Sequence, residues 1–224
     1  MSRNAVITGG TGALGQAVVE RLLRDDVRCH VTWKFEAELE SFRYADSVAL
    51  HEVDCASEAG VSAFYAGLPG VDASIHIVGG FAMAGVLDTT RDDFVSMFEL
   101  NAVTAFLCSR EAIRVMRGQG GGRIVNVAAR PAVQPTGGMV AYTTAKAAVA
   151  SLTQCLAEEV RQDGICVNAI LPSMLDTKAN REEMPDADFD CWPKLEEVAE
   201  TVAFLAGPTN GLTSGALIPV FGRA

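Results

Sequence analysis

A short apolar run passes into a glycine-rich turn in the segment Ala5-Val6-Ile7-Thr8-Gly9-Gly10-Thr11-Gly12-Ala13-Leu14-Gly15, which sets the architecture expected for the whole chain. From Leu14 to Arg24, apolar residues recur at helical spacing, so the pattern indicates a strand, a turn and a helix. Glycines in such a turn let the backbone approach a pyrophosphate, and the helix N-terminus directs free N–H groups at the anion. A purely structural turn is the alternative. The position at the first strand–helix junction favours a dinucleotide site formed by Gly9, Thr11, Gly12, Ala13, Leu14 and Gly15.

The rest of the chain alternates between apolar runs and helical patterns. Further strands are expected at residues 28–33, 47–53, 73–78, 123–128, 165–171 and 216–221. Between them, helices are expected near 57, from 90 through Asn101 to about 116, over 140–156 and over 193–206. This alternation predicts an α/β fold with a parallel sheet and helices on both faces. The polar segment 178–193 is expected to be irregular and to form a mobile flap over the substrate.

The composition limits the protein to a few classes. At 224 residues with 49% hydrophobic content, the chain predicts a single domain over residues 1–224. A net charge of -10 argues against nucleic acid or an anionic membrane as a partner, because phosphate binding needs a basic stripe. The six scattered cysteines predict free thiols, and no metal-ligand spacing is present, so no metal is expected. Without a signal region or an apolar stretch of membrane-spanning length, the chain is expected to be cytoplasmic.

Residues after the second and third expected strands indicate how the adenosine end of the dinucleotide is bound. The second strand ends in Trp33-Lys34, where an acidic residue would bind the ribose hydroxyls and favour NAD. A lysine can instead accept a 2′-phosphate, so Lys34 favours NADPH, although a solvated surface charge explains it equally well. Asp54 follows the third strand and can accept from the adenine amino group. The alternative is that Asp54 caps the helix that begins near Ser57.

Residues that would bind the rest of the cofactor follow the fourth and sixth expected strands. The glycines of Val78-Gly79-Gly80 suit close passage of a cofactor, although a tight turn alone would also require them. Pro172 closes the sixth strand, and Thr177 lies within reach of a ligand across the carboxyl ends of the strands. Asn101 stands among apolar residues in the long helix and needs a hydrogen-bond partner if it is buried.

The helix expected over 140–156 carries Tyr142 and Lys146 one turn apart. Residues at i and i+4 project from the same helix face, so the phenol and the ammonium can reach one ligand together. A nearby cation favours the phenolate, so we expect the pKa of Tyr142 to lie below its usual value of about 10. The tyrosine would then be a usable proton donor near neutral pH. This spacing is common on solvated helix faces, so the assignment depends on the other motifs.

In their order along the chain, the glycine turn, Asn101, Tyr142, Lys146 and the turn at Pro172 resemble the short-chain dehydrogenase/reductase family. The resemblance covers the whole chain and implies a seven-stranded, doubly wound Rossmann fold, NAD(P)(H) as the cofactor, and a homodimer or homotetramer. It also implies that Tyr142 donates a proton, that Lys146 holds the nicotinamide ribose and lowers the tyrosine pKa, and that Asn101 supports a proton-relay water. Subunits of the family pair through the helices that would contain Asn101 and Tyr142.

Two departures from the family pattern affect the expected chemistry. Thirteen residues before the tyrosine, the family usually has a serine that hydrogen-bonds the substrate carbonyl, and this chain has Ala129. Losing one such donor costs about 2.7 to 4 kcal/mol of transition-state stabilisation, so ordinary ketone reduction is expected to be handicapped unless another group substitutes. The family's Asn-Asn-Ala-Gly motif after the fourth strand is here His76-Ile77-Val78-Gly79, so His76 stands inside an expected strand. It is expected to be a hydrogen-bonded core histidine rather than an acid–base catalyst.

Both departures point to the dihydropteridine reductase branch of the family. That branch also lacks the serine and is similar to this chain at residues 9–15, 78–81, 138–142 and 171–192. A quinonoid dihydropterin accepts a hydride into a conjugated ring system and a proton on nitrogen, so no alkoxide forms that would need the serine. The second strand differs, because the branch carries an aspartate that favours NAD where this chain has Trp33. The candidate substrate contacts are Phe81, Ala129, Arg130 and Met139.

The sequence leaves three hypotheses, each with a small molecule as the ligand. The first is an NAD(P)H-dependent oxidoreductase that transfers a hydride to a small planar conjugated substrate. The second is a carbonyl or 3-oxoacyl reductase in which Thr136, Thr143 or a water replaces the missing hydroxyl. The third is a non-catalytic NAD(P)-binding sensor, which the loss of the serine alone would allow. The presence of both Tyr142 and Lys146 disfavours this third hypothesis.

Overall fold

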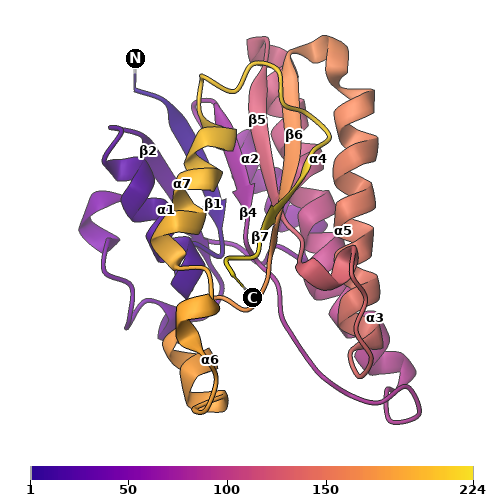
Figure 1. Cartoon of the computed structure of the whole chain (residues 1–224). Helices are drawn as coiled ribbons and strands as arrows, with labels where there is room; N and C mark the ends of the chain where they lie inside the picture. The colour runs from indigo at the N-terminus through magenta and orange to yellow at the C-terminus, as the bar shows by residue number, and fades with distance from the viewer. Residues whose placement is uncertain (1, 224) are drawn as a thin grey trace.

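One parallel sheet forms the centre of the molecule. The computed structural model describes residues 2–223, and the strand order is β3-β2-β1-β4-β5-β6-β7 (Figure 1). The strands are β1 (Asn4–Thr8), β2 (Arg28–Trp33), β3 (Ala49–Glu52), β4 (Ala73–His76), β5 (Gly122–Val127), β6 (Ile165–Pro172) and β7 (Leu217–Val220). Each neighbouring pair is parallel, which confirms the expected single-domain, seven-stranded Rossmann fold. The direction of winding reverses between β1 and β4, and folds of this kind bind ligands outside the carboxyl ends of the strands at such a point.

Helices cover both faces of the sheet. On one face lie α1 (Ala13–Leu23) and α7 (Leu195–Ala206). The opposite face is covered by α2 (Glu58–Ala66), α4 (Thr104–Gln119) and α5 (Val140–Glu159). The two remaining helices are α3 (Arg91–Phe98), which leads into α4, and α6 (Lys178–Glu183), which lies beyond the carboxyl ends of the strands (Figure 1). The molecule therefore has three layers, a helical layer on each face of the sheet. The segments that lead to α3 and α6 leave the sheet at the carboxyl ends of β4 and β6.

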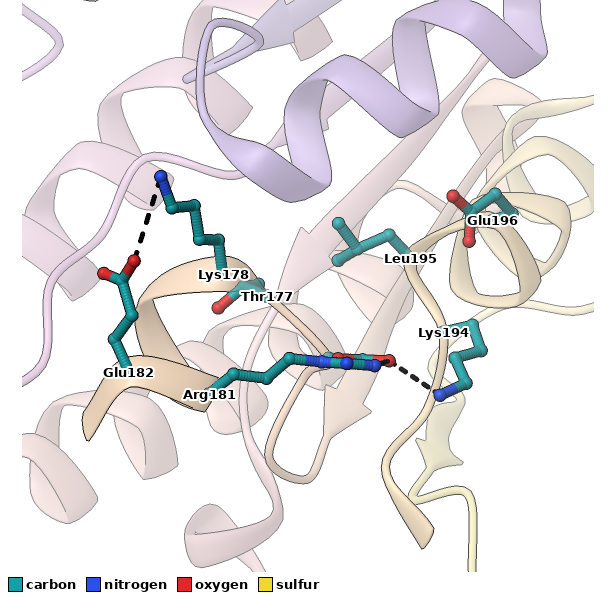
Figure 2. Close-up of a pocket in the computed structure, with 8 residues that line it drawn as sticks. Thr177, Lys178, Arg181, Glu182, Lys194, Leu195 and Glu196 are labelled. Atoms are coloured by element: carbon teal, nitrogen blue, oxygen red, sulfur yellow. Dashed lines mark hydrogen bonds and ion pairs between the residues drawn. The ribbon is translucent and has the colours of Figure 1, made fainter. Parts of the chain in front are cut away.

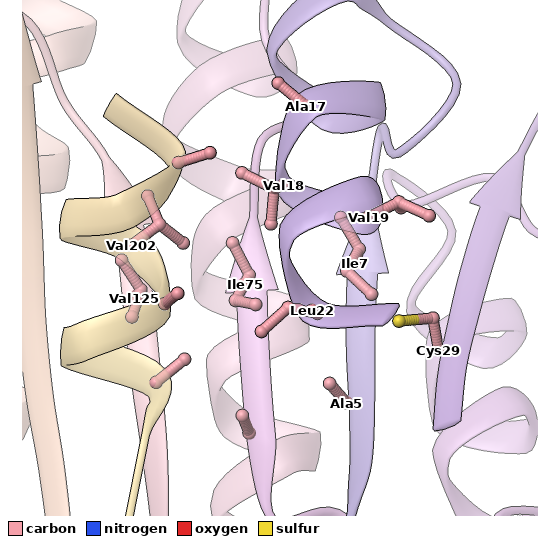
Figure 3. Packing of buried hydrophobic residues seen from close by; sticks show 14 of the residues in the cluster. Ala5, Ile7, Ala17, Val18, Val19, Leu22, Cys29, Ile75, Val125 and Val202 are labelled. Atoms are coloured by element: carbon pink, nitrogen blue, oxygen red, sulfur yellow. The ribbon is translucent and has the colours of Figure 1, made fainter. Parts of the chain in front are cut away.

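The core between α1, α7 and the sheet explains why the first helix forms where the sequence predicts it. Val18 and Leu22 of α1 point toward Ile7 and Ile75 of the sheet, and Val202 of α7 lies beside them (Figure 3). All of these side chains are buried. Burying one aliphatic side chain of this size contributes about 1.5 to 3 kcal/mol, so the apolar face of α1 is held mainly by this contact.

Gly15 lets α1 start directly against the glycine turn. A Cβ atom on Gly15 would lie 2.3 Å from the carbonyl oxygen of Gly9 and 2.5 Å from the Cα atom of Gly10. Any side chain at this position would therefore force the helix away from the backbone of the turn. The close approach fixes the first turn of α1 next to the end of β1.

The structure corrects two expected boundaries. The third strand is shorter than the predicted 47–53, because Ala45–Ser47 forms a 3-10 turn before β3. The predicted long helix extends to Gln119 and contains a π-helical turn, Glu99–Val103, between α3 and α4. Periodicity alone does not reveal such a turn, which inserts one residue into the helical repeat.

The segment 178–193 is more ordered than the irregular flap predicted from its polarity. It contains α6 and a 3-10 turn, Phe189–Cys191. Thr177 supplies the N-cap of α6, since its Oγ1 accepts a hydrogen bond from the backbone N–H of Asn180. The prediction missed this cap because the apolar periodicity of a six-residue helix is too short to detect.

A buried polar network surrounds His76 in β4. His76 is 3% exposed, its Nδ1 lies 2.8 Å from Oδ1 of Asn126, and its Nε2 lies 2.8 Å from Oγ of Ser74. The Ser74 hydroxyl in turn lies 2.7 Å from the hydroxyl of Tyr65. Burial lowers the pKa of His76 to about 4, so the ring is neutral at pH 7. The prediction of a hydrogen-bonded core histidine is confirmed.

We expect acid to destabilise the fold through His76. The histidine pKa is 6.5 in its ordinary state and about 4 in the fold, so the unfolded chain binds more protons between these values. Stability therefore falls as the pH is lowered from about 6.5 to about 4, by at most about 3 kcal/mol. Urea unfolding measures this loss when the wild type and His76→Gln are compared at pH 7 and pH 4.5. Each pH lies within about one unit of one of the two pKa values. A smaller acid-dependent loss is expected in the variant, and equal losses would contradict the prediction.

Candidate active site

The glycine turn presents an open helix N-terminus at the carboxyl edge of the sheet. Gly12 is the N-cap of α1, it supplies no side-chain cap, and the first turn of α1 contains no acidic residue. Both Gly12 and Ala13 are exposed, whereas Leu14 points into the core. Such an end leaves backbone N–H groups and the positive end of the helix dipole available for an anion. The turn therefore fits the pyrophosphate of a dinucleotide.

Glu38 lies between the glycine turn and the end of β2. Its Oε2 accepts a hydrogen bond of 2.7 Å from the buried Thr11 hydroxyl. Its Oε1 accepts from the backbone N–H groups of Lys34 and Phe35, at 3.1 and 3.0 Å. The sequence interpretation did not identify Glu38, because it considered only the last residues of the strand. An acidic residue about 20 positions after the glycine turn was the available signal.

Lys34 and Asp54 bind each other. Their side chains form an ion pair of 2.8 Å, with Lys34 47% and Asp54 42% exposed. Asp54 Oδ1 also accepts from the backbone N–H of Ala56, and together these contacts lower the carboxyl pKa, chiefly through Lys34. The alternative interpretation of Asp54 as the cap of α2 is wrong, since the Ser57 hydroxyl accepts from the N–H of Gly60 and caps that helix. Trp33 is half-buried at the end of β2.

The π-helical turn places Asn101 beside the glycine pair that follows β4. Asn101 is 1% exposed, its Nδ2 donates to the carbonyl oxygens of Gly80 and Met97, and its Oδ1 accepts from the Gly80 N–H at 3.2 Å. A Cβ atom on Gly79 would lie 2.6 Å from Oδ1 of Asn101 and 3.2 Å from Nζ of Lys146. The side chain that the sequence left without a partner is therefore satisfied. A larger residue at position 79 would press on both polar groups, and one at position 80 would lie 2.5 Å from Cδ2 of Leu100.

Lys146 reaches from α5 to the end of β5. Its ammonium donates to the carbonyl oxygen of Val127 at 2.8 Å, the residue is 5% exposed, and burial lowers its pKa to about 8. Nζ lies 5.9 Å from the centre of the Tyr142 ring. The expected lowering of the Tyr142 pKa is wrong for this structure, because burial raises it to about 12. The phenol therefore carries its proton at neutral pH.

Two of the candidate substrate residues, Phe81 after β4 and Met139 before α5, provide apolar side chains near Tyr142. Phe81 is 54% exposed, and its ring packs edge-to-face on the Tyr142 ring with the centres 4.9 Å apart. The segment after Phe81 runs beside the start of α5, since Ala84 donates its N–H to the carbonyl oxygen of Gly138. Next to it, a cavity of about 350 Å³ is lined by Met139 together with Ala82, Met83, Ala84, Thr89, Asp93, Ser96, Met97, Leu100, Val140 and Ala141.

The residues after β5 provide no hydroxyl at the position where the family has serine. Ala129 is 4% exposed and presents only a methyl group. Next to it, Arg130 donates through Nε to the side chain of Gln134 at 2.8 Å, and its guanidinium lies 5.2 Å from the centre of the Phe221 ring. In the part of the chain that the structure describes, Thr143 Oγ1 is the single buried hydroxyl without a hydrogen-bond partner.

The carboxyl edge is bounded on the other side by the segment after β6. Pro172 is buried as the last residue of β6, and Thr177 stands at the start of α6. A cavity of about 500 Å³ is lined there by Asp176, Thr177, Lys178, Arg181, Glu182, Lys194, Leu195 and Glu196 (Figure 2). Charged side chains from α6 and from the start of α7 thus converge next to Thr177.

The described residues form neither a metal site nor a membrane-spanning helix. Within residues 2–223, no group of three or more His, Cys, Asp or Glu side chains is arranged to hold a metal ion. No helix in the same range is long and apolar enough to cross a bilayer. The six cysteines carry free thiols.

Comparisons with known proteins agree with this arrangement. At 28% identity, the chain is similar to 2,3-dihydroxy-2,3-dihydro-p-cumate dehydrogenase of Pseudomonas putida over 97% of its length and 92% of the relative. It is 32% identical to 2-(R)-hydroxypropyl-CoM dehydrogenase of Xanthobacter autotrophicus over 99% of this chain and 98% of that one. A solved structure of ElxO with NADP bound has the same fold, with a TM-score of 0.91 at 22% identity, and covers 99% of this chain and 98% of that chain. Residues 3–188 match the short chain dehydrogenase family, so the protein belongs to this family of NAD(P)-dependent dehydrogenases and reductases.

Proposed function

We propose that the protein is an NAD(P)H-dependent reductase that transfers a hydride to a small planar conjugated substrate, as dihydropteridine reductase does. The observation that carries the proposal is the environment of Tyr142. Its phenol shares a helix face with Lys146 and packs against the exposed ring of Phe81, while the buried methyl group of Ala129 replaces the usual serine. A planar ring system can stack on Phe81, and it would meet a proton donor without a hydroxyl for an alkoxide.

The residues at the carboxyl edge fit a dinucleotide from one end to the other. When bound, NAD(P)H supplies the hydride. The glycine turn and the open end of α1 would bind the pyrophosphate, and Lys146 would hold the nicotinamide ribose. The remaining contacts would come from Trp33, Asp54, Val78, Gly79, Gly80, Pro172 and Thr177. Gly79 packs closely against Asn101 and Lys146, so a side chain at this position would displace the two polar groups.

Tyr142 would donate the proton. Its raised pKa keeps the phenol protonated at pH 7, and the cation of Lys146 stabilises the phenolate that remains after the proton has left. Asn101, held by Gly80 and Met97, would support a water that returns the proton to Tyr142. With a ring nitrogen as the proton acceptor, no developing alkoxide needs the missing serine.

At the adenosine end, Glu38 is the strongest argument about cofactor choice. Three hydrogen bonds fix its carboxylate, and a 2′-phosphate placed next to it would be repelled. Lys34 is exposed and already paired with Asp54, so it offers less to a phosphate than the sequence suggested. The preference for NADPH predicted from Lys34 is replaced in this proposal by a preference for NADH.

Thr143 supports a second candidate function, reduction of an ordinary carbonyl compound. A buried hydroxyl without a partner is costly unless a ligand completes it, and Thr143 directly follows the proposed proton donor. In this candidate the Thr143 hydroxyl replaces the missing serine. The two curated relatives are dehydrogenases of a dihydrodiol and of a hydroxypropyl compound, which suits this chemistry. The third hypothesis, a non-catalytic sensor, has no specific observation in its favour.

The proposal includes a cytoplasmic homodimer or homotetramer in which 178–193 acts as a flap. Support for the assembly comes from apolar side chains on the outer surface of α3, α4 and α5. A shallow cavity of about 250 Å³ there is lined by Phe98, Ala102, Val103, Phe106, Ala148 and Leu152. Both Phe98 and Phe106 are more than a third exposed, as expected for side chains that a second subunit covers.

Replacing Tyr142 with phenylalanine tests the proton donor. We expect kcat with quinonoid dihydropterin and NADH to fall at least about 100-fold, because a positioned general acid contributes factors of this size. Tyr44→Phe is the matched control, since the Tyr44 hydroxyl donates to Glu20 away from the cleft. Steady-state oxidation of NADH measures both variants. Activity of Tyr142→Phe within a few-fold of the wild type would rule out the proposed donor.

Replacing Glu38 with glutamine tests the cofactor preference. The substitution keeps the size of the side chain and removes its charge, so the ratio of kcat/KM for NADPH to that for NADH should rise by about tenfold. Glu36→Gln is the control, because Glu36 is exposed in the same turn. An unchanged ratio in Glu38→Gln would show that this carboxylate does not select the cofactor.

Replacing Thr143 with valine separates the two candidate functions. For a planar heterocyclic acceptor, we expect kcat/KM of Thr143→Val to stay within about threefold of the wild type, since a proton delivered to a ring nitrogen leaves no alkoxide for this hydroxyl to stabilise. Thr144→Val is the control, because Thr144 is exposed in the same helix. A loss of about 100-fold or more on the best carbonyl substrate would establish Thr143 as the replacement donor and favour carbonyl reduction.

A further inference from the structure

The flap between β6 and α7 is closed at its base by a single carboxylate. Asp176 lies two residues before the flap (178–193), and Lys194 directly follows it, immediately before α7. Lys194 Nζ donates to Asp176 Oδ2 at 2.7 Å, and the backbone N–H of Asp176 donates to the carbonyl oxygen of Pro193 at 3.1 Å. Both ends of the flap are thus tied to each other through the side chain and the main chain of one residue.

Asp176 also holds the helix inside the flap. Arg181 of α6 binds it with two parallel hydrogen bonds, from Nε to Oδ1 at 2.5 Å and from Nη2 to Oδ2 at 2.8 Å. The Asp176 side chain is only 9% exposed, whereas Arg181 and Lys194 are 47% and 37% exposed. In Figure 2, Arg181 and Lys194 point toward each other from opposite sides of the cavity. Bidentate pairs of this kind fix the direction as well as the distance of a contact.

Aromatic side chains complete the closed base. The Arg181 guanidinium lies 4.7 Å from the centre of the Phe189 ring, and Phe189 packs on Trp192 with the ring centres 5.0 Å apart. Lys194 also donates to the carbonyl oxygen of Phe189 at 3.3 Å. Two of these three contacts involve an arginine or a lysine that binds Asp176.

We propose that Asp176 is a positioning residue for cofactor binding, because its carboxylate clamps the base of the flap and thereby fixes Thr177 at the carboxyl edge of the sheet. The inference rests on the proposed contact between Thr177 and the cofactor. Thr177 directly follows Asp176, and its Oγ1 is committed to the first turn of α6 as an acceptor, which leaves its O–H free to donate.

Two cations around one carboxylate make the clamp sensitive to the loss of its charge. Arg181 and then Lys194 hold the pKa of the Asp176 carboxyl far below its ordinary value, so it is ionised throughout the neutral range. Without that charge, Arg181 and Lys194 would face each other unpaired, and like charges repel. The flap would then sample open positions, and binding of a cofactor would have to order it again.

Direct cofactor binding and limited proteolysis of the full-length protein test the clamp. For Asp176→Asn, titration with NADH and with NADPH, followed by the fluorescence of the bound nicotinamide, should give a Kd raised by about tenfold for the tighter cofactor. Chymotrypsin should cleave after Phe189 faster by a similar factor, about tenfold, because the flap opens more often. The wild-type melting temperature serves as the reference for the fold. Should Asp176→Asn not fold, Lys194→Met removes one of the two ties and is expected to change both quantities in the same direction.

Glu200→Gln is the matched control. Glu200 forms an ion pair of 2.7 Å with Arg21 between α7 and α1, at a distance from the flap base in the chain, and it takes no part in the proposed site. This variant should match the wild type in Kd and in cleavage rate. Asp176→Asn with an unchanged Kd would overturn the inference, even if cleavage were faster, since an open flap would then have no effect on the cofactor.

Thr177→Asp distinguishes the clamp from the contact through which it acts. We expect this variant to bind the cofactor more weakly and to be cleaved at the wild-type rate, because the carboxylate still accepts the capping hydrogen bond at the start of α6 but has no O–H to donate. Normal binding by Thr177→Asp would overturn both the inferred role of Asp176 and the proposed contact of Thr177. The assignment of Tyr142 as the proton donor would be unaffected, since it is measured by turnover.

Discussion

Close approach of backbone segments at glycines is the constraint on which the cleft depends. A Cβ atom on Gly15 would collide with the turn that starts α1, and one on Gly9 would lie 2.9 Å from the N atom of Val78 after β4. Gly79 in turn leaves room for Asn101 and Lys146, whose polar atoms would lie 2.6 and 3.2 Å from its Cβ. These contacts connect α1, β1, the end of β4, the π-helical turn before α4, and α5 across the carboxyl edge. They fix the separation between the proposed pyrophosphate site and the proposed proton donor.

Lys146 and Asn101 at the proposed catalytic end are buried, and each is paired with a group from another segment. Lys146 donates to the end of β5, and Asn101 exchanges hydrogen bonds with Gly80. Burial lowers the pKa of the lysine to about 8 and raises that of Tyr142 to about 12. The tyrosine is thus an acid that keeps its proton until a ligand changes its surroundings, and the lysine is the cation that would stabilise its conjugate base. His76 lies deeper in the sheet and, as a neutral histidine at pH 7, contributes structure only.

This chain differs from the common pattern of its family at the proposed substrate site and at the proposed adenosine site. A methyl group stands at Ala129, the exposed ring of Phe81 packs on the proposed proton donor Tyr142, and the hydroxyl of the next residue, Thr143, has no partner. At the other end, Glu38 places a fixed carboxylate next to the glycine turn, where β2 is followed by a lysine. On the flap, Asp176 concentrates two cations on one anion. Each feature changes the charge or the hydrogen-bonding capacity at the cleft and leaves the fold as it is.

Sequence alone determined the order of strands and helices, the glycine turn and the pair Tyr142 and Lys146, because these depend on local periodicity and on residues within one turn of each other. It did not reveal the π-helical turn that aims Asn101, since a single inserted residue leaves the apolar pattern intact. It also misjudged the pKa of Tyr142, and it did not reveal the ion pair of Lys34 with Asp54, the position of Glu38 or the contacts of Asp176. Those features depend on residues far apart in the chain, such as Thr11 and Glu38 at a separation of 27 positions and Asp176 and Lys194 at 18. Only the tertiary structure decides which such groups meet and how deeply each is buried, because both depend on how the helices pack on the sheet.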